Sequence, residues 1–127
     1  MKREAVGTAG APKAIGPYSQ AVRAGGFLFC SGQLPLDPST GKMVDGGIDA
    51  QTERVLKNLE AVLNAGGATL RSVVKTTVYL VDMGDFPAMN AVYAKFFPED
   101  PPARATVQIG KLAAGAIVEI DAVAATG

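Results

Sequence analysis

The sequence predicts an α+β fold in a single domain that spans residues 1–127. Three observations predict it: β-prone runs and helical patterns follow one another along the chain, two patterns have helical length with one apolar face, and glycine or proline clusters separate the segments. A chain of this length can bury roughly two thirds of the surface that its unfolded form exposes. We therefore expect one hydrophobic core and no second domain.

The first predicted element is a β-hairpin. Residues Gln20–Arg23 and Phe27–Ser31 are β-prone, and the sequence Ala24-Gly25-Gly26 joins them as a glycine turn. The next segment, 34–47, contains two prolines and three glycines, so we expect an irregular loop there.

Two amphipathic helices are predicted after this loop. The first begins with Asp49 as its N-cap and stops at Gly66, and its buried face is predicted from helical spacing to contain Thr52, Val55, Leu59, Val62 and Leu63. The second follows Asp82–Asp85 and ends before Pro98, with Pro87 in its first turn. Its apolar stripe is typical of a helix that packs on a sheet and consists of Phe86, Met89, Val92, Tyr93, Phe96 and Phe97.

Three further strands are predicted over residues 73–81, 105–109 and 117–124, which are rich in valine, isoleucine and threonine. In the last of them Val118, Ile120 and Ala122 point one way. Glu119 and Asp121 point the other way, so two acids share one face of the sheet.

Two helices cannot cover both faces of a sheet with this many strands, so one face must meet water or another subunit. The predicted strands contain few charges in either register, whereas a water-facing antiparallel face normally alternates cleanly between apolar and polar residues. We therefore expect a homo-oligomer with binding sites between its subunits.

Composition excludes several classes of function. Twelve Lys plus Arg balance twelve Asp plus Glu, with the signs interspersed, so no electrostatic footprint for nucleic acid is present. The chain has no histidine, which excludes Ser-His-Asp and Cys-His catalysis and every His-ligated zinc site. The glycine pairs match neither the dinucleotide fingerprint nor the phosphate loop. We expect neither a metal nor a cofactor.

The sequence also predicts where the protein works. Residues 1–16 lack the apolar stretch of a signal peptide, and no apolar run reaches membrane-spanning length. The single cysteine, Cys30, cannot form an internal disulfide, which agrees with a reducing compartment. We expect a cytoplasmic protein that does not enter a membrane.

Arg104 is the leading candidate for a binding residue. The segment Pro101-Pro102-Ala103-Arg104 places its guanidinium where a proline-stiffened loop becomes a strand, and the planar fork matches a carboxylate through two hydrogen bonds. A surface salt bridge is the commoner role for an arginine, so companion residues must decide between the two.

Five other residues need an interpretation beside Arg104. Beside an arginine in a pocket, Glu119 could act as a general base or hold a water. Ser31 is interpreted as a hydrogen-bond donor, because the chain offers no histidine to activate it as a nucleophile. Tyr18 and Asn90 each have an ordinary structural interpretation, as a packing aromatic and an exposed helix residue, and Cys30 is interpreted as a small buried hydrophobic residue.

Six short motifs connect these residues along the chain. In order they are Ala14-Ile15-Gly16-Pro17-Tyr18-Ser19-Gln20, Ser31-Gly32-Gln33, Val74-Lys75-Thr76-Thr77-Val78-Tyr79, Asp85-Phe86 with Asn90, Pro102-Ala103-Arg104 and Val118-Glu119-Ile120. The ordered set covers nearly the whole chain and resembles the Rid family, also called YjgF-like, the reactive intermediate deaminases.

The resemblance implies a chorismate-mutase-like α+β subunit, with a mixed sheet and two helices on one face. It further implies a barrel-cored homotrimer with three pockets between its subunits. Tyr18, Ser31, Arg104 and Glu119 match the family's pocket residues. Asn90 is implied to lie close to the site and Gly32 to keep the backbone accessible. Thr106, also a substrate-binding position, stands where many members carry cysteine.

The implied activity is the hydrolysis of 2-imino acids or their enamine tautomers, such as 2-aminoacrylate, 2-iminopropanoate and 2-iminobutanoate, to 2-keto acids and ammonia. Arg104 would bind the substrate carboxylate, and Glu119 would orient and deprotonate the attacking water. Ser31 or a nearby backbone group would hold the substrate nitrogen. Tyr18 of the neighbouring subunit would form one wall of the pocket. The 2-keto or 2-imino carboxylate is the only small-molecule partner expected.

Two alternatives remain. The first is a non-enzymatic trimer that senses a small carboxylate, and Glu119 argues against it because a carboxylate beside the ligand's own carboxylate would weaken binding. The second is an RNA-acting inhibitor of translation, which has been proposed for relatives. Zero net charge and the lack of a basic aromatic stripe argue against that second function.

Overall fold

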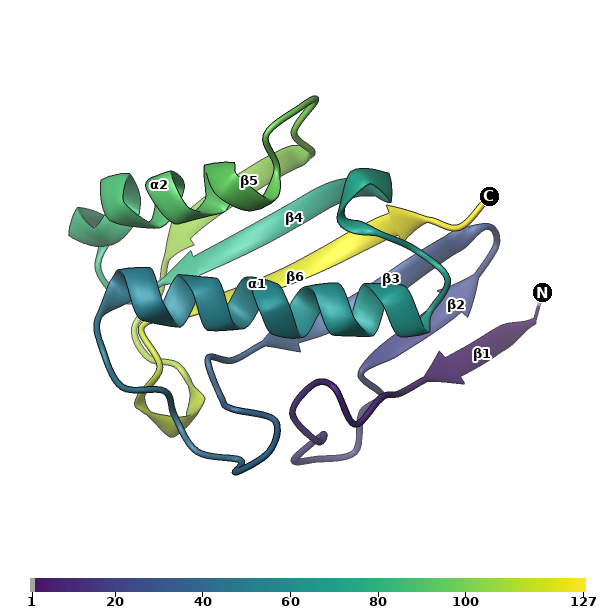
Figure 1. Ribbon diagram of the computed structural model, residues 1–127, viewed down its shortest axis with the longest axis horizontal. Helices are drawn as coiled ribbons and strands as arrows, with labels where there is room; N and C mark the ends of the chain where they lie inside the picture. Colours follow the sequence, from purple (N-terminus) through teal and green to yellow (C-terminus); the bar gives the residue numbers. More distant parts are fainter. Residues whose placement is uncertain (1) are drawn as a thin grey trace.

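The computed structural model of the chain describes residues 2–127. In chain order its main elements are β1 (Arg3–Val6), β2 (Ala21–Ala24), β3 (Phe27–Gln33), α1 (Ile48–Ala65), β4 (Val73–Leu80), α2 (Phe86–Phe96), β5 (Ala103–Gln108) and β6 (Val118–Ala125). The six strands form one sheet in the order β1-β2-β3-β6-β4-β5, and both helices lie on the same side of it (Figure 1). Neighbouring strands are antiparallel except for the parallel pair β4 and β5. The predicted α+β fold is confirmed.

The predicted hairpin is β2 and β3. Gly25 and Gly26 have φ angles of 59° and 82°, a left-handed conformation that glycine adopts without steric cost. β3 continues to Gln33, two residues beyond the predicted end, and its pairing with β6 is irregular between Cys30 and Gln33. This bulge lies beside the predicted site residues Ser31 and Gly32.

Helix α1 begins one residue before the predicted N-cap. Gly47 occupies the cap position, and the expectation of Asp49 as N-cap is wrong. Asp49 instead lies in the first turn, where its negative charge faces the positive end of the helix dipole. The earlier start also brings Ile48 against the core. The predicted stop at Gly66 is confirmed, and the whole predicted apolar face of this helix is buried.

Helix α2 covers the β4 and β5 end of the sheet. It follows a short 3-10 turn over Met83–Asp85, has proline in its first turn and ends before Pro98, as predicted. Of its apolar stripe, Met89, Val92, Tyr93 and the following Phe97 are buried, and Phe86 and Phe96 pack against the core while partly exposed.

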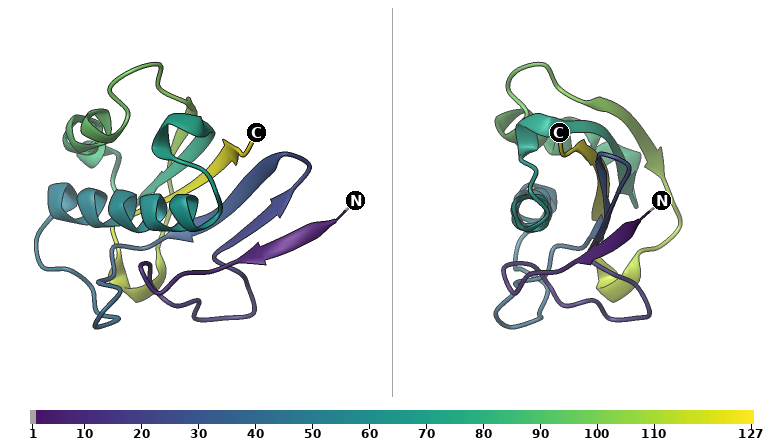
Figure 2. Two further views of the ribbon diagram at one scale, coloured as in Figure 1. Left: turned by 45° about the vertical axis from the view of Figure 1, so that its right-hand side comes forward. Right: turned by 90° about the vertical axis from the view of Figure 1, so that its right-hand side faces the viewer.

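The two faces of the sheet differ sharply. Leu28, Val78 and Ile120 point toward the helices and are fully buried. Seen along the sheet, α1 and α2 both lie on one side (Figure 2), and on the other side Phe29 exposes 48% of its surface. The acids Glu119 and Asp121 lie on this uncovered face, because they alternate with the buried positions of β6.

β1 was not predicted from the sequence. Its four residues are mostly exposed and include two charges, so they carry no clear strand pattern. β1 pairs with β2 at the edge of the sheet, where Glu4 forms an ion pair with Arg23, and Arg23 also donates to the carbonyl of Gly66. Tertiary contacts therefore hold β1 in the sheet, although its own sequence has no strand pattern.

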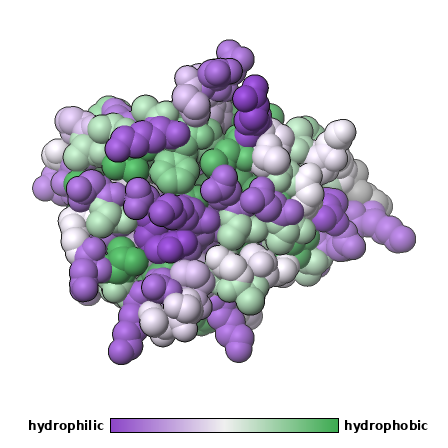
Figure 3. Space-filling view, viewed as in Figure 1, coloured by the Kyte–Doolittle hydropathy of each residue, from purple (hydrophilic) through white to green (hydrophobic). Residues whose placement is uncertain are grey.

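The outer surface of the helical layer is hydrophilic over much of α1, with apolar patches beside it (Figure 3). Glu53 and Lys57 are exposed there, with Lys Nζ 3.7 Å from the carboxylate oxygen. In residues 2–127, no helix combines the length and apolar character needed to cross a membrane.

Candidate functional site

Arg104 lies against helix α2 rather than in open solvent. It pairs in register with Thr76 of β4, and because Thr76 faces the helices, the Arg104 side chain lies on the same, covered side of the sheet. Its guanidinium carbon is 4.7 Å from the ring centre of Tyr93 and 5.4 Å from that of Phe86. Both distances allow a cation–π interaction.

A hollow of about 370 Å³ adjoins this arginine. Its walls are mainly apolar and are made by Asn90, Tyr93, Ala94, Phe97, Pro101, Pro102 and Arg104. The Oδ1 atom of Asn90 is buried without a hydrogen-bond partner in the part of the chain that the structure describes. The hollow thus combines a cation with a vacant hydrogen-bond acceptor.

No carboxylate of residues 2–127 pairs with Arg104, although other arginines here do form ion pairs, such as Arg23 with Glu4 and Arg71 with Glu99. Aromatic rings, which do not neutralise charge, occupy the place of an acidic partner. A guanidinium held in this way keeps its N–H donors for an anionic ligand, and its fork suits a carboxylate.

Glu119 occupies a second cluster, on the uncovered face. A side chain on Gly32 would overlap the Glu119 carboxylate, so glycine at this position makes room for it. Burial raises the pKa of Glu119, and the negative charge of Asp121 raises it further. Tyr79 of β4 lies opposite Glu119 of β6 in the sheet. Its hydroxyl donates a hydrogen bond to Asp121 Oδ2 at 3.0 Å. A carboxyl with a raised pKa is a stronger base once ionised.

Ser31 and Tyr18 lie near this second cluster. The Ser31 hydroxyl donates to the carbonyl of Ser19 at 2.6 Å, so toward a ligand its oxygen is available as an acceptor. The hydroxyl hydrogen of Ser31 is therefore already donated within the protein. Tyr18 is half exposed, its hydroxyl accepts from the Ile15 amide at 3.3 Å, and it lines a small hollow together with Gly32.

The structure of one chain does not bring Arg104 and Glu119 together. Arg104 is on the covered side in β5, Glu119 is on the uncovered side in β6, and β4 separates the two strands. Asn90 joins Arg104 in its hollow, and Thr106 lies two residues further along β5, beside Val78. The predicted site residues thus form two groups, with Arg104, Asn90 and Thr106 at one edge and Glu119, Gly32, Ser31 and Tyr18 around the bulge.

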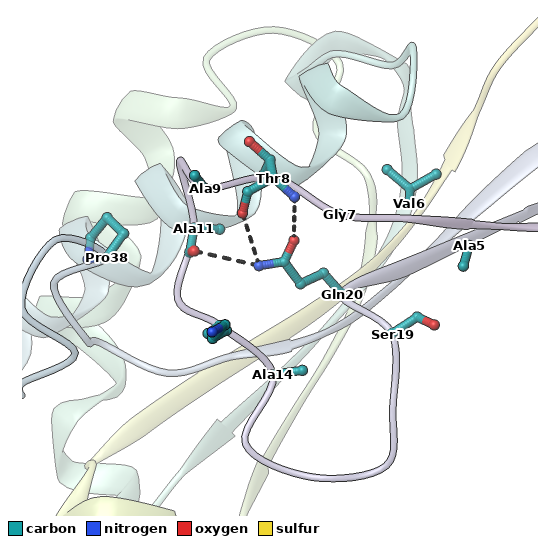
Figure 4. A pocket seen from close by; sticks show the side chains of 11 residues that line it. Ala5, Val6, Gly7, Thr8, Ala9, Ala11, Ala14, Ser19, Gln20 and Pro38 are labelled. Carbon is teal, nitrogen blue, oxygen red and sulfur yellow. Dashed lines mark hydrogen bonds between the residues drawn. The ribbon is translucent and has the colours of Figure 1, made fainter.

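Another hollow, of about 660 Å³, lies away from these two groups, beside the segment that leads from β1 to β2 (Figure 4). Gln20 organises this segment: its Oε1 accepts from the Thr8 amide at 2.7 Å, and its Nε2 donates to the carbonyls of Thr8, Ala11 and Pro12. Lys13 is the only charged residue in the lining. Because the polar atoms of Gln20 are already satisfied, this hollow offers little chemistry.

Other reactive groups are unsuited to catalysis. Burial, with a smaller effect from the charge of Asp121, raises the pKa of the Cys30 thiol to about 12, so its thiolate is scarce at neutral pH. Cys30 is buried, as interpreted from the sequence. No group of three or more His, Cys, Asp and Glu within residues 2–127 is arranged to hold a metal ion.

Sequence reasoning missed the residues that support the two groups. Tyr93 was assigned only to the core, yet its ring contacts Arg104 and its hydroxyl lies 2.7 Å from the Thr76 hydroxyl. Tyr79 was assigned no role, yet it reaches Asp121. Both are tyrosines whose hydroxyl finds a partner, Tyr93 on the covered face and Tyr79 on the uncovered face, so the polar tip of a packed aromatic residue is the signal that could have identified them.

Comparison with known proteins gives a clear assignment. The model of the YjgF/Rid family, described as Endoribonuclease L-PSP, matches residues 8–126. The chain belongs to the Rid family. This Rid protein is 52% identical over 122 residues to a RutC family protein of Pyrococcus horikoshii, covering 96% of this chain and 97% of the relative.

Two further relatives extend the comparison. A human protein named 2-iminobutanoate/2-iminopropanoate deaminase is 45% identical over 125 residues, covering 98% of this chain and 91% of the relative. The crystal structure of a putative endoribonuclease of Thermotoga maritima superposes with a TM-score of 0.96 at 49% identity, covering 100% of this chain and 99% of the other. Both the family and its fold therefore extend over nearly the whole of this Rid protein.

Proposed function

We propose that this Rid protein hydrolyses 2-imino acids and their enamine tautomers to 2-keto acids and ammonia. The observation that carries the proposal is Arg104, a guanidinium without an acidic partner among the described residues, backed by two aromatic rings beside an apolar hollow. The orphan Oδ1 of Asn90 adds an acceptor for a ligand N–H. A relative at 45% identity that is named for this activity supports the same substrate class.

The proposed reaction needs only positioning and one base. Arg104 binds the carboxylate of the 2-imino acid through two N–H groups, which places the neighbouring C=N carbon for attack. Glu119 accepts a proton from water as the oxygen bonds to that carbon, and it returns this proton to the former imine nitrogen. The C–N bond of the resulting aminoalcohol then breaks, with the hydroxyl proton passing through Glu119 to the leaving nitrogen, so that ammonia departs and the 2-keto acid remains. Ser31, whose own hydrogen is donated to Ser19, accepts a hydrogen bond from the substrate nitrogen.

The proposed site is completed between subunits of a homotrimer. Arg104 and Glu119 of one chain lie on opposite faces of the sheet, so a second copy must supply the missing group. The uncovered face offers a surface for such a copy, because Phe27, Phe29 and Val107 are exposed on it. In the assembled site Tyr18 forms a wall contributed by the neighbouring subunit.

A direct assay tests this function. A threonine or serine dehydratase generates 2-iminobutanoate or 2-aminoacrylate in situ, and keto-acid release is timed with and without the protein. We expect faster release with the protein, and no acceleration with Glu119→Gln. Equal rates with and without the parent protein would overturn the proposal. Sedimentation at micromolar concentration tests the trimer separately, and a monomer would contradict the interface pocket.

Two other functions receive less support. A non-enzymatic carboxylate sensor would need only Arg104, and the Glu119 carboxylate would weaken its ligand binding. Action on RNA is suggested by the endoribonuclease descriptions of the family model and of one solved relative. Zero net charge in this chain disfavours binding to a phosphate backbone.

A further inference from the structure

One face of helix α2 is built around the guanidinium of Arg104. Phe86, Asn90 and Tyr93 are separated by four and three residues, so they lie one above another along the helix. The guanidinium carbon lies within 5.4 Å of the Phe86 ring centre and 4.7 Å of the Tyr93 ring centre. Rings from two successive turns of one helix therefore contact the same cation.

Tyr93 is held in place by contacts with β4 and with its own helical segment. Its hydroxyl lies 2.7 Å from the hydroxyl of Thr76, and both side chains are buried. Its ring packs on Phe97 with the ring centres 4.7 Å apart. Thr76 is also the residue of β4 that pairs directly with Arg104 of β5. One position of β4 thus fixes both the backbone from which Arg104 extends and the ring on which its guanidinium rests.

We propose that Tyr93, oriented by Thr76, is a positioning residue that aims the Arg104 guanidinium at the carboxylate of the ligand. The inference rests on the proposed function, because it concerns the same arginine. A long arginine side chain loses rotamer freedom when it binds, and a guanidinium already held between rings has less freedom to lose. The rings contact the guanidinium without neutralising its charge, so its fork can still form two parallel hydrogen bonds with a carboxylate.

The tyrosine hydroxyl is suited to this role. Burial raises the pKa of Tyr93, although Thr76 and the charge of Arg104 act in the opposite direction. The phenol is therefore neutral at physiological pH. It forms a hydrogen bond with the Thr76 hydroxyl and brings no negative charge to the arginine. Phenylalanine here would keep the ring and lose the link to the strand.

The test uses four single variants and one double variant of the full-length protein. Tyr93→Leu removes the ring, Tyr93→Phe removes only the hydroxyl, and Thr76→Val removes the same hydrogen bond from its other end. Phe96→Leu is the matched control, because Phe96 belongs to the same helix and packs on the core but is not in contact with Arg104. The probe is 2-oxobutanoate, a 2-keto acid that does not turn over, with its Kd measured by calorimetry.

We expect Tyr93→Leu to raise the Kd for 2-oxobutanoate about three- to thirtyfold, the range of one cation–π contact. Tyr93→Phe and Thr76→Val should each raise it about two- to fivefold. The double variant that combines Tyr93→Phe with Thr76→Val should have a Kd no higher than that of the weaker-binding single variant, because the two hydroxyls form one hydrogen bond. Phe96→Leu should leave the Kd unchanged. In kinetics the loss should appear in KM more than in kcat.

A spectroscopic measurement separates positioning from a merely structural role. The Nε–Hε resonance of Arg104 should carry a ring-current shift that Tyr93→Phe retains and Tyr93→Leu reduces to the contribution of the Phe86 ring. An unchanged Kd in a folded Tyr93→Leu protein, or an unchanged Kd in both hydroxyl variants, would overturn the inference. Parent protein that binds 2-oxobutanoate in a Tyr93-dependent way but fails to accelerate imine hydrolysis would overturn the proposed function alone.

Discussion

The two faces of the single sheet show how one strand pattern produces two different surfaces. On the covered face, alternate residues of β3, β4 and β6 meet both helices and form a dry core in which Leu28, Val78 and Ile120 are fully buried. On the uncovered face, the residues between them include exposed phenylalanines and two carboxylates. The difference teaches that burial in this molecule is decided by where the helices lie, since strand composition alone would allow either face to be core.

The same division applies to charge. Arg104 lies on the covered side and is surrounded by aromatic rings, so its charge is supported without being neutralised. Glu119 lies half-buried on the uncovered side beside a second carboxylate, and burial first, then the charge of Asp121, raise its pKa and disfavour its ionised form. In the proposed reaction, the covered side supplies the cation that binds the carboxylate, and the uncovered face supplies the base.

The largest expected effect concerns the base on the uncovered face. Glu119→Gln keeps the shape of the side chain and removes its ability to accept a proton, so we expect kcat to fall about 10²- to 10⁴-fold. The Kd for 2-oxobutanoate should change far less. Steady-state kinetics and calorimetry on the same preparation check both. Equal turnover in the variant and the parent would show that Glu119 has only a structural role, and it would favour a non-enzymatic protein that senses a small carboxylate.

A pair of truncations tests the difference in burial. Leu80→Ala opens a cavity in the covered face, so we expect the free energy of unfolding to fall by about 2–5 kcal/mol. Val107→Ala, on the uncovered face, should cost less than about 1 kcal/mol in the isolated subunit. Urea denaturation at two protein concentrations checks this. Any loss at Val107 should shrink on dilution, because in the proposed trimer a partner subunit covers this residue. Equal losses at both positions would contradict the comparison.

Arg104→Lys tests whether the cation on the covered side acts through its geometry. Lysine keeps the charge and loses the fork, so we expect kcat/KM to fall at least about tenfold, in line with the loss of part of a charge-assisted pair. The melting temperature should stay near that of the parent, because Arg104 lies at the rim of the core. A variant with near-normal keto-acid release would show that Arg104 does not bind the substrate carboxylate through its fork. A variant that unfolds or dissociates would show that Arg104 stabilises the fold or the subunit interface.

The smallest expected effect is a shift in pH dependence. Burial is the main cause of the raised pKa of Glu119 and the charge of Asp121 the lesser one, so Asp121→Asn should lower that pKa without restoring its ordinary value of 4.5. The acid limb of the kcat/KM profile should move to lower pH, since the base must be ionised. An unmoved or upward-shifted limb would show that Asp121 does not act on the reacting carboxyl.

The same shift has a consequence for stability. A carboxyl whose pKa is higher in the folded state stabilises the fold at pH values below its unfolded pKa and loses that contribution as pH rises through the folded pKa. Glu119→Gln should therefore raise the free energy of unfolding, relative to the parent, more above pH 4.5 than below it.

The sequence by itself determined the local elements of this protein. Alternation in residues 118–124, helical spacing from Thr52 to Leu63 and the paired glycines of the hairpin each depend on contacts within a few residues, and all three predictions are confirmed. The motifs likewise identified the family, which the comparison with known proteins confirms, whereas the roles of the site residues stay a prediction. Such patterns are visible because backbone geometry repeats over two or about four residues.

The tertiary structure alone decided how these elements combine. The exposed strand β1 has no pattern of its own and forms because β2 offers a free edge. Tyr93 meets Thr76 and Arg104 only because α2 crosses over the parallel pair β4 and β5. Arg104 and Glu119 lie on opposite faces because β5 pairs with β4 in one particular register. Registers and strand order follow from long-range packing of the whole core, which no local stretch of sequence encodes.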